Sequence, residues 1–187
     1  MKTTNASTNA IWTIDPLDST VGFGIRHFMV ATVRGVFREL SGSIHYDPAH
    51  PEATEIRVDI PVASVDTRVP DRDAHLRAAD LFDAAAYPTI TFRSTGARLD
   101  DGGKVGQIVG DLTIRGTTRA VTLTVVEIAG RQKDHRGNVR IGASATTTIK
   151  RSDYGIKYNF ALEAGGLAIG DEVAITLDVS LVEGAAR

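Results

Sequence analysis

Apolar and polar residues alternate with a period of two along most of this chain, which is the pattern of half-buried β-strands. The alternation is cleanest near the C-terminal end, where Val173, Ile175, Leu177, Val179 and Leu181 are separated by polar or small residues. Such alternation is typical of a sheet with two unlike faces. Comparable runs predict about eight strands, over residues 21–29, 36–46, 56–63, 90–99, 106–114, 120–128, 139–149 and 173–181.

The connections between these runs favour antiparallel neighbours. Asp101-Gly102 and Arg115-Gly116 are short turns, too short for the crossover that a parallel pair requires. Several of the 18 glycines, Gly22 and Gly42 among them, lie inside strand patterns, where glycine permits the bends that close a barrel. We therefore predict an all-β fold, an eight-stranded antiparallel barrel. A two-sheet sandwich with a packed core is the alternative.

One segment, DRDAHLRAADLFDAAAYPTITF over residues 71–92, departs from the strand pattern and predicts a short helical insert. Leu76 and Phe82 lie at helical spacing on one apolar face. Asp73 and Arg77 are four residues apart, so we expect an ion pair across one helical turn. A single helix in a sheet-rich chain plugs, covers or gates something. The insert therefore predicts a barrel whose interior can hold a ligand.

Composition narrows the class of protein. A chain of 187 residues fits one domain. The net charge of −2 offers no basic face, so we expect no nucleic-acid partner. Without cysteine there is neither a disulfide nor a thiol nucleophile, and no apolar run is long enough for stable membrane insertion. The first ten residues lack the apolar run of a secretory signal. We expect a cytoplasmic protein with a disordered tail over residues 1–10 and a single domain over residues 11–187.

Catalytic motifs are missing from the sequence. It contains no G-x-S-x-G elbow, H-E-x-x-H pair, P-loop or dinucleotide fingerprint, and its five histidines are scattered. Asp71, Asp73 and His75 suggest a metal site, but ion pairing is the preferred interpretation of that cluster. We therefore expect a protein that is not an enzyme and has no cofactor and no metal. His27 takes an inward place at the end of an apolar row, where it is suited to meet a ligand head group.

Four separated blocks resemble the YceI family, in this order along residues 12–182. They read DSTVGFGIRHFMVATVRGVFRELSGSIHYD, then SVDTRVPDRDAHLRAADLFDAAAYPTITFRST, then GDLTIRGTTRAVTLTV, and finally IKRSDYGIKY with GDEVAITLDVSLV. The resemblance implies an extended lipocalin-like barrel of eight antiparallel strands with helical inserts. It also implies a long apolar tunnel that binds polyisoprenoids or related amphiphilic lipids, and it implies homodimers.

Candidate ligand contacts fall into two sets. By alternation or helix face, the candidates for the cavity lining are Phe23, Ile25, His27, Phe37, Phe82, Phe92, Ile114 and Ile149, and plain core packing is the alternative for each. The candidates for the head group are Arg72, His75, Arg119 and Arg151. Structural pairing with Asp80, Asp83 and Asp153 is the alternative, and it is the interpretation that we favour for Arg119 and Arg151.

The function that we predict is binding of a long-chain amphiphilic lipid, which the protein sequesters or carries in an apolar barrel tunnel. Polyisoprenoids, isoprenoid quinones and fatty-acid derivatives are the ligand classes that fit. Two alternatives stay open. One is a stress-linked interaction protein whose cavity is incidental, and the other is an enzyme that uses His75, Asp73 or Arg72 on a lipid-like substrate.

Overall fold

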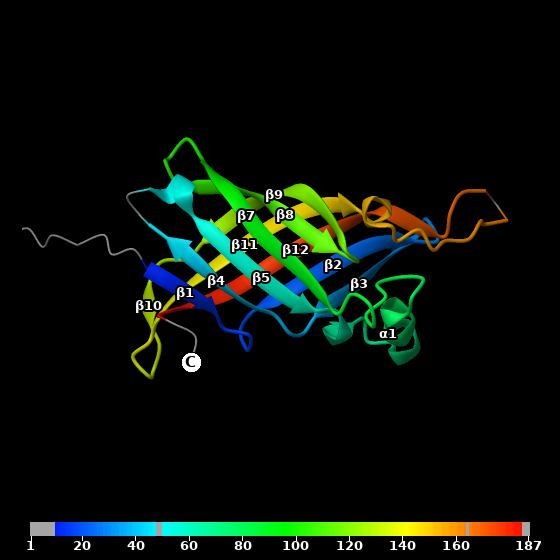
Figure 1. Ribbon diagram of the computed structural model, residues 1–187, viewed down its shortest axis with the longest axis horizontal. Helices are drawn as coiled ribbons and strands as arrows, with labels where there is room; N and C mark the ends of the chain where they lie inside the picture. Colours follow the sequence, from blue (N-terminus) through cyan, green and yellow to red (C-terminus); the bar gives the residue numbers. More distant parts are fainter. Residues whose placement is uncertain (1–9, 48–49, 164, 185–187) are drawn as a thin grey trace, which may run out of the picture.

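The structure, a computed structural model, describes residues 10–47, 50–163 and 165–184 (Figure 1). The predicted disordered tail falls outside the described residues, apart from Ala10, with which the first strand begins. The strands are β1 (Ala10–Ile14), β2 (Thr20–His27), β3 (Ala31–Phe37), β4 (Ser41–Tyr46), β5 (Glu55–Pro61), β6 (Val65–Asp66), β7 (Thr89–Leu99), β8 (Val105–Ile114), β9 (Thr117–Ile128), β10 (Gln132–Lys133), β11 (Val139–Lys150) and β12 (Ile169–Glu183). Helix α1 is Pro70–Arg77, and the short 3-10 turns are η1 (Pro51–Ala53), η2 (Val62–Ser64) and η3 (Arg151–Tyr154).

The sheet closes on itself, which confirms the predicted eight-stranded antiparallel barrel. The strands follow one another in the order β11, β9, β8, β7, β5, β4, β1, β12, and β12 pairs back onto β11. The same edge of β12 that pairs with β1 pairs further along with β2, and β2 continues through β3 to β6. The pairs β1–β2, β3–β4 and β5–β6 are therefore three long strands, each interrupted once.

Two of the predicted strands differ from the observed ones. The run over residues 36–46 is broken between β3 and β4, where the Arg38 amide donates to the Ser64 carbonyl outside the strand ladder. The run over residues 21–29 ends at His27, because Phe28 and Met29 have positive φ angles of 51° and 61° and reverse the chain. Met29 is exposed at this turn and does not continue the inward row.

Helix α1 is shorter than the sequence pattern suggests. It ends at Arg77, and the chain then runs through turns to β7. The predicted pairing of Asp73 with Arg77 is wrong in its details. The buried Asp73 carboxylate accepts hydrogen bonds from the amide and hydroxyl of Thr67, and Arg77 Nε donates instead to the Asp73 carbonyl. Helix α1 is thus fastened to the chain just after β6, at one end of the barrel (Figure 1).

Inward-facing residues of every barrel strand form one apolar interior. Glycines make room for aromatic rings at two inward positions. A Cβ at Gly110 would lie 2.5 Å from Cζ of Phe92, and a Cβ at Gly35 would lie 2.4 Å from Cζ of Phe23. The rings therefore occupy space that side chains at these positions would otherwise fill.

No helix of the described chain is long and apolar enough to cross a membrane.

Candidate functional site

The interior of the barrel is hollow. A cavity of about 940 Å³ occupies it. Side chains from all eight strands of the barrel line this cavity, together with Leu76 in α1 and Leu81 and Phe82 in the segment after it. This volume lies near the upper end of the range for small-molecule sites, about 300–1,000 Å³. Along β12 the alternate residues from Val173 to Leu181 all line it, which corresponds to roughly 26 Å of strand. The cavity is therefore long as well as large.

The cavity approaches the surface at both ends of the barrel. Lys104 and Arg131, which line it at the end near β10, are exposed. Tyr158 and Phe160, which line it at the α1 end, are also exposed. Since exposed residues border the cavity at both ends, its shape is that of a tunnel.

All the residues predicted to line a cavity do line it. Phe23, Ile25, His27, Phe37, Phe82, Phe92, Ile114 and Ile149 belong to the wall of this cavity. Phe23, Phe37 and Phe82 form a chain of aromatic contacts, with ring centroids 5.7 Å and 5.9 Å apart. That these residues contact a ligand stays a prediction.

Arg72 and His75 reach the cavity from α1. Arg72 donates from Nε to the Thr67 hydroxyl and from Nη2 to the Thr67 carbonyl. His75 Nε2 lies 2.8 Å from Oδ2 of Asp80, and the His75 ring packs edge-to-face on Tyr158 with centroids 4.8 Å apart. The His75 contact is the largest cause that lowers the pKa of the Asp80 carboxyl. These bonds hold both side chains at the cavity wall.

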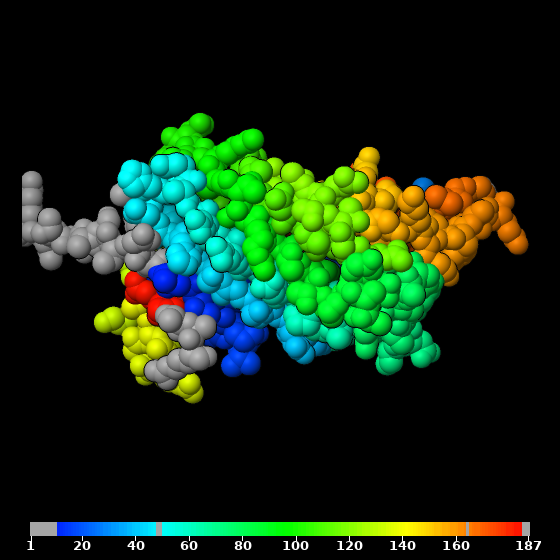
Figure 2. All heavy atoms as spheres, viewed as in Figure 1, coloured from blue at the N-terminus to red at the C-terminus, as the bar shows by residue number. Residues whose placement is uncertain are grey.

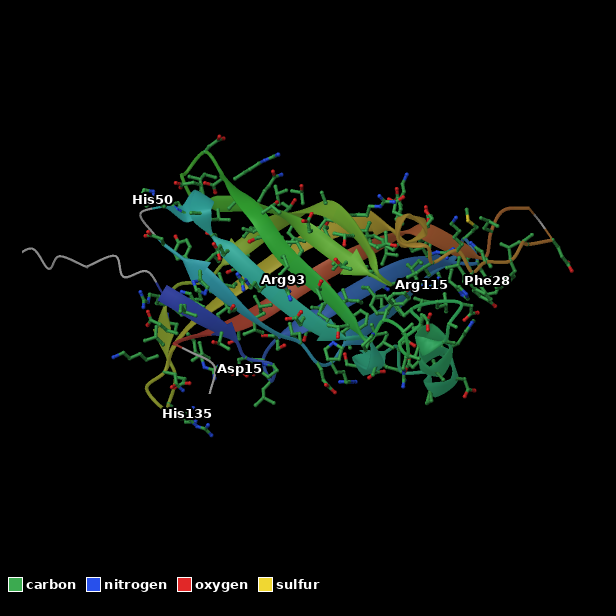
Figure 3. The ribbon with its side chains drawn as sticks, viewed as in Figure 1. Asp15, Phe28, His50, Arg93, Arg115 and His135 are labelled. Carbon is green, nitrogen blue, oxygen red and sulfur yellow. The ribbon has the colours of Figure 1, made fainter. Side chains whose placement is uncertain are left out.

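Arg115 joins the segments that surround this end of the cavity (Figure 3). It lies in the β8–β9 turn and donates from Nη1 to the Gly155 carbonyl and from Nη2 to the Ala79 carbonyl. The turn, the segment after α1 and the chain after η3 are thus tied together by one guanidinium group.

Arg151 is a buried cation in the cavity wall that is bound by carbonyl groups. Its guanidinium donates to the carbonyls of Gly170, Ile156, Tyr158 and Ile169. Among the described residues, no carboxylate lies within ion-pair distance of it, and burial lowers the pKa of the group. The expected pairing of Arg151 with an aspartate is therefore not the observed arrangement. The carbonyl oxygens carry only partial negative charge, so they do not themselves neutralise the guanidinium.

Arg119 lies apart from the other three head-group candidates. It is exposed, is not part of the cavity wall, and donates from Nε to the Asp153 carbonyl. Its position therefore offers no support for the head-group role predicted for it.

Two polar groups in the cavity wall were not singled out from the sequence. The hydroxyl of Tyr154 and Nε1 of Trp12 are buried, and neither has a hydrogen-bond partner among the described residues. Burial raises the pKa of Tyr154 to about 12, so this hydroxyl stays protonated and is a donor. A buried donor without an acceptor typically costs about 1–3 kcal/mol. The alternation of Trp12 and Ile14 around Thr13 was a signal for an inward Trp12, whereas Tyr154 follows the end of a strand and had none.

The β10 end of the cavity has a different chemistry. Arg131 lies over the Trp12 ring, 5.3 Å from its centroid, and pairs with Glu183. The arginine at this end is thus exposed and paired with a carboxylate, whereas Arg151 at the α1 end is buried and has no carboxylate within ion-pair distance in the described ranges. In the described part of the chain, no group of three or more His, Cys, Asp and Glu residues is placed to hold a metal ion.

The fold and cavity together define a class, the antiparallel β-barrel with a long apolar interior. Residues 12–181 match the sequence profile of the YceI-like domain. The chain is 39% identical over 137 residues to Protein YceI of Escherichia coli O157:H7, which covers 73% of this chain and 70% of that protein. A UPF0312 protein of Azotobacter vinelandii is 37% identical over the same length and coverage. The chain belongs to the YceI family.

Solved structures show the same fold. BcnA of Burkholderia cenocepacia superposes with a TM-score of 0.71 at 25% identity, covering 89% of this chain and 98% of BcnA. The Campylobacter jejuni YCEI protein gives a TM-score of 0.68 at 31% identity, covering 86% and 91%. A polyisoprenoid-binding domain from Saccharophagus degradans, implicated in plant cell wall breakdown, gives 0.65 at 19% identity, covering 92% and 98%. The last likeness concerns the fold alone.

Proposed function

We propose that this protein binds a long-chain amphiphilic lipid, with its tail in the barrel cavity. The observation that carries the proposal is the apolar cavity of about 940 Å³ that extends between the two ends of the barrel. A polyisoprenoid, an isoprenoid quinone or a fatty-acid derivative has the elongated apolar tail that such a cavity fits. The Saccharophagus degradans domain of the same fold, described as polyisoprenoid-binding, supports this choice of ligand class.

The polar head of the ligand lies at the α1 end in this proposal. Arg72 and His75 border the cavity there, and Arg151 adds a buried positive charge. The Tyr154 hydroxyl adds a buried donor for which the described part of the chain offers no acceptor. These are all hydrogen-bond donors or cations, so they favour a head group rich in oxygen acceptors, such as a phosphate, a carboxylate or a quinone carbonyl.

The tail supplies most of the contact in this proposal. Burying one methylene contributes roughly 0.8 kcal/mol, so about ten buried carbons contribute roughly 8 kcal/mol before costs. Ordering of the flexible tail and loss of free motion offset a large share of that gain. The donors at the α1 end therefore set orientation and head-group preference more than affinity.

Binding rather than catalysis is the activity that the cavity supports. His75 is bonded to Asp80, and the buried Asp73 carboxylate accepts two hydrogen bonds from Thr67, so both side chains are held by neighbouring residues of α1 and its flanks. The cytoplasmic location and the homodimer inferred from the sequence stay predictions.

Native mass spectrometry of protein purified without detergent tests this function. We expect a mass excess over the bare chain that solvent extraction releases as a molecule with a long apolar tail. Ala145→Phe, which adds a ring to the cavity wall, should reduce this excess, because Ala145 lines the cavity. Thr146→Phe on the exposed side of the same strand is the matched control and should leave it unchanged. A bare mass, together with no uptake of added polyisoprenol, would refute lipid binding.

A further inference from the structure

Large apolar side chains are exposed together at the α1 end of the barrel. Figure 1 shows that the β2–β3 turn and the loop segments 157–163 and 165–168 meet at this end, and Figure 3 labels Phe28 there. We call the following residues the hydrophobic tip: Phe28, Met29, Val30, Phe160 and Leu167, whose exposed fractions range from 43% to 79%. Clusters of exposed apolar residues of this kind mark interaction sites more often than single exposed residues do.

The tip is held together by specific contacts between its two segments. The Phe28 amide donates to the Ala168 carbonyl, and the Ala168 amide donates to the Phe160 carbonyl. The Phe28 and Phe160 rings pack edge-to-face, with centroids 5.7 Å apart. Phe28 and Met29 both have positive φ angles, which are uncommon for bulky side chains. The apolar residues are thus presented by a defined turn rather than by a loose loop.

The hydrophobic tip is continuous with the opening of the cavity. Phe160 belongs to both, since it is part of the tip and also lines the cavity. His27, Tyr158 and Ile169, which flank the tip residues in sequence, line the cavity as well. Figure 2 shows the loop segments 157–163 and 165–168 projecting beyond the end of the barrel. An apolar partner that covers the tip would therefore meet the cavity opening directly.

Charge does not dominate this surface. Residues 27–33 and 165–170 contain no Lys, Arg, Asp or Glu. Next to them in the sequence, the exposed or half-buried chain carries the cations Arg26, Arg34 and Lys157 and, in equal number, the acids Glu163, Asp171 and Glu172. An uncharged surface flanked by equal numbers of cations and acids fits an apolar partner better than a strongly charged partner.

We propose that the hydrophobic tip docks the protein on the surface of a lipid bilayer, with the cavity opening turned toward the membrane. This docking rests on the proposed lipid binding. A lipid tail that passes directly from the bilayer into the cavity avoids contact with water. Projecting aromatic and aliphatic side chains are suited to the boundary between head groups and acyl chains. A second copy of the chain seated on the tip would instead cover the opening.

Flotation with phosphatidylcholine vesicles tests the docking. The tip variant carries Met29→Asn, Val30→Ser and Leu167→Ser, because asparagine tolerates the positive φ at residue 29 and none of the three residues lines the cavity. The matched control carries Leu17→Ser, Leu99→Ser and Val126→Ser, which are exposed apolar positions away from the tip and outside the cavity wall. We expect the tip variant to float about tenfold less than the unmodified protein, and the control variant to float equally well.

Two further measurements separate docking from cavity binding and from self-association. Uptake of a polyisoprenol from detergent solution should be equal for the unmodified protein and the tip variant. If the unmodified protein floats and the tip variant does not, docking is supported even when no lipid enters the cavity. In that case only the proposed function fails.

The docking proposal is overturned by equal flotation of both proteins or by no flotation of either. It is also overturned if flotation requires anionic phosphatidylglycerol and disappears in about 1 M salt, where charges are screened beyond about 3 Å. Sedimentation that shows a dimer which the tip variant converts to a monomer would assign the tip to a second copy and overturn docking.

Discussion

Phe23 on β2 and Gly35 on β3 are directly opposite each other across the strand pair, and the Phe23 ring occupies the space beside Gly35. A Cβ on Gly35 would meet not only Cζ of Phe23 at 2.4 Å but also Cγ2 of Thr67 at 2.8 Å. The absence of a side chain at residue 35 therefore sets the position of an aromatic ring that lines the cavity.

Gly35→Ala should destabilise the protein by about 1–3 kcal/mol, the usual cost of overpacking a filled site. Phe23→Leu in the same chain should restore part of this loss, because it shortens the side chain that the new methyl group meets. Urea denaturation measures both effects. Gly24→Ala is the matched control, since its nearest contact would be an ordinary 3.4 Å to Cγ2 of Thr32. Equal losses for Gly35→Ala and Gly24→Ala would show that the ring does not depend on Gly35.

Affinity should rise with tail length and depend little on salt. Each added isoprene unit buries more apolar area, so the dissociation constant should fall stepwise and level off when the cavity is full. Titration of polyisoprenols of increasing length, at low and high salt, measures this. An affinity that is independent of length and falls tenfold or more with salt would indicate a binder that relies on exposed charges.

Arg151→Met should destabilise the fold by about 3 kcal/mol, because several carbonyls would lose their donor in a buried place. The affected carbonyls include those of Ile156 and Gly170, which lie before and after the two tip residues Phe160 and Leu167 in the chain. Thermal and urea unfolding measure the loss. Lys150→Met, at the exposed neighbouring position, should change stability by less than about 0.5 kcal/mol. Equal stability of the two variants would show that the carbonyl cage contributes little.

Tyr154→Phe should leave the ligand-free protein equally stable or slightly more stable. The hydroxyl that it removes is buried and has no partner among the described residues, so no hydrogen bond is lost. Binding of a lipid with an acceptor head group should weaken by about tenfold if the hydroxyl meets that head, the equivalent of about 1.4 kcal/mol. Binding of a tail hydrocarbon should not change. Tyr87→Phe, at an exposed position outside the cavity wall, is the control. Equal weakening for both ligands would remove Tyr154 from the head-group site.

Stability should fall in acid partly through Asp134. A hydrogen bond from the Asn138 side chain is the largest cause that lowers the pKa of this carboxyl, and one from Arg140 is the next. Together they hold the pKa well below its ordinary value of 3.8. A carboxyl with a lowered pKa stabilises the folded state above its ordinary pKa, and that contribution is lost as pH falls below about 3.8. Asp134→Asn should therefore have a lower melting temperature at neutral pH and a shallower decline below pH 4. Asp101→Asn, in an exposed turn, should follow the unmodified protein. Parallel pH profiles for the Asp134 variant and the unmodified protein would contradict this origin.

Much of the barrel was predictable because the inward and outward faces of a strand alternate in the sequence itself. The residues of β12 from Val173 to Leu181 face the cavity at every second position, as their alternation indicates. The same local rule placed Phe23, Phe92 and Ile149 on the interior wall. It holds because successive side chains on a strand point to opposite faces, whatever the rest of the chain does.

Only the tertiary structure decided between a packed sandwich and a hollow barrel, because alternation is the same in both. Closure depends on the pairing of β11 with β12, and the cavity depends on how far apart the inward faces then lie. The Arg151 cage was likewise beyond sequence patterns, since its acceptors lie 5 to 19 residues further along the chain. Every residue has a backbone carbonyl, so the sequence does not indicate which carbonyls will bind the guanidinium. Alternation along the chain thus determines which faces are apolar, and contacts between distant strands and loops determine what those faces enclose.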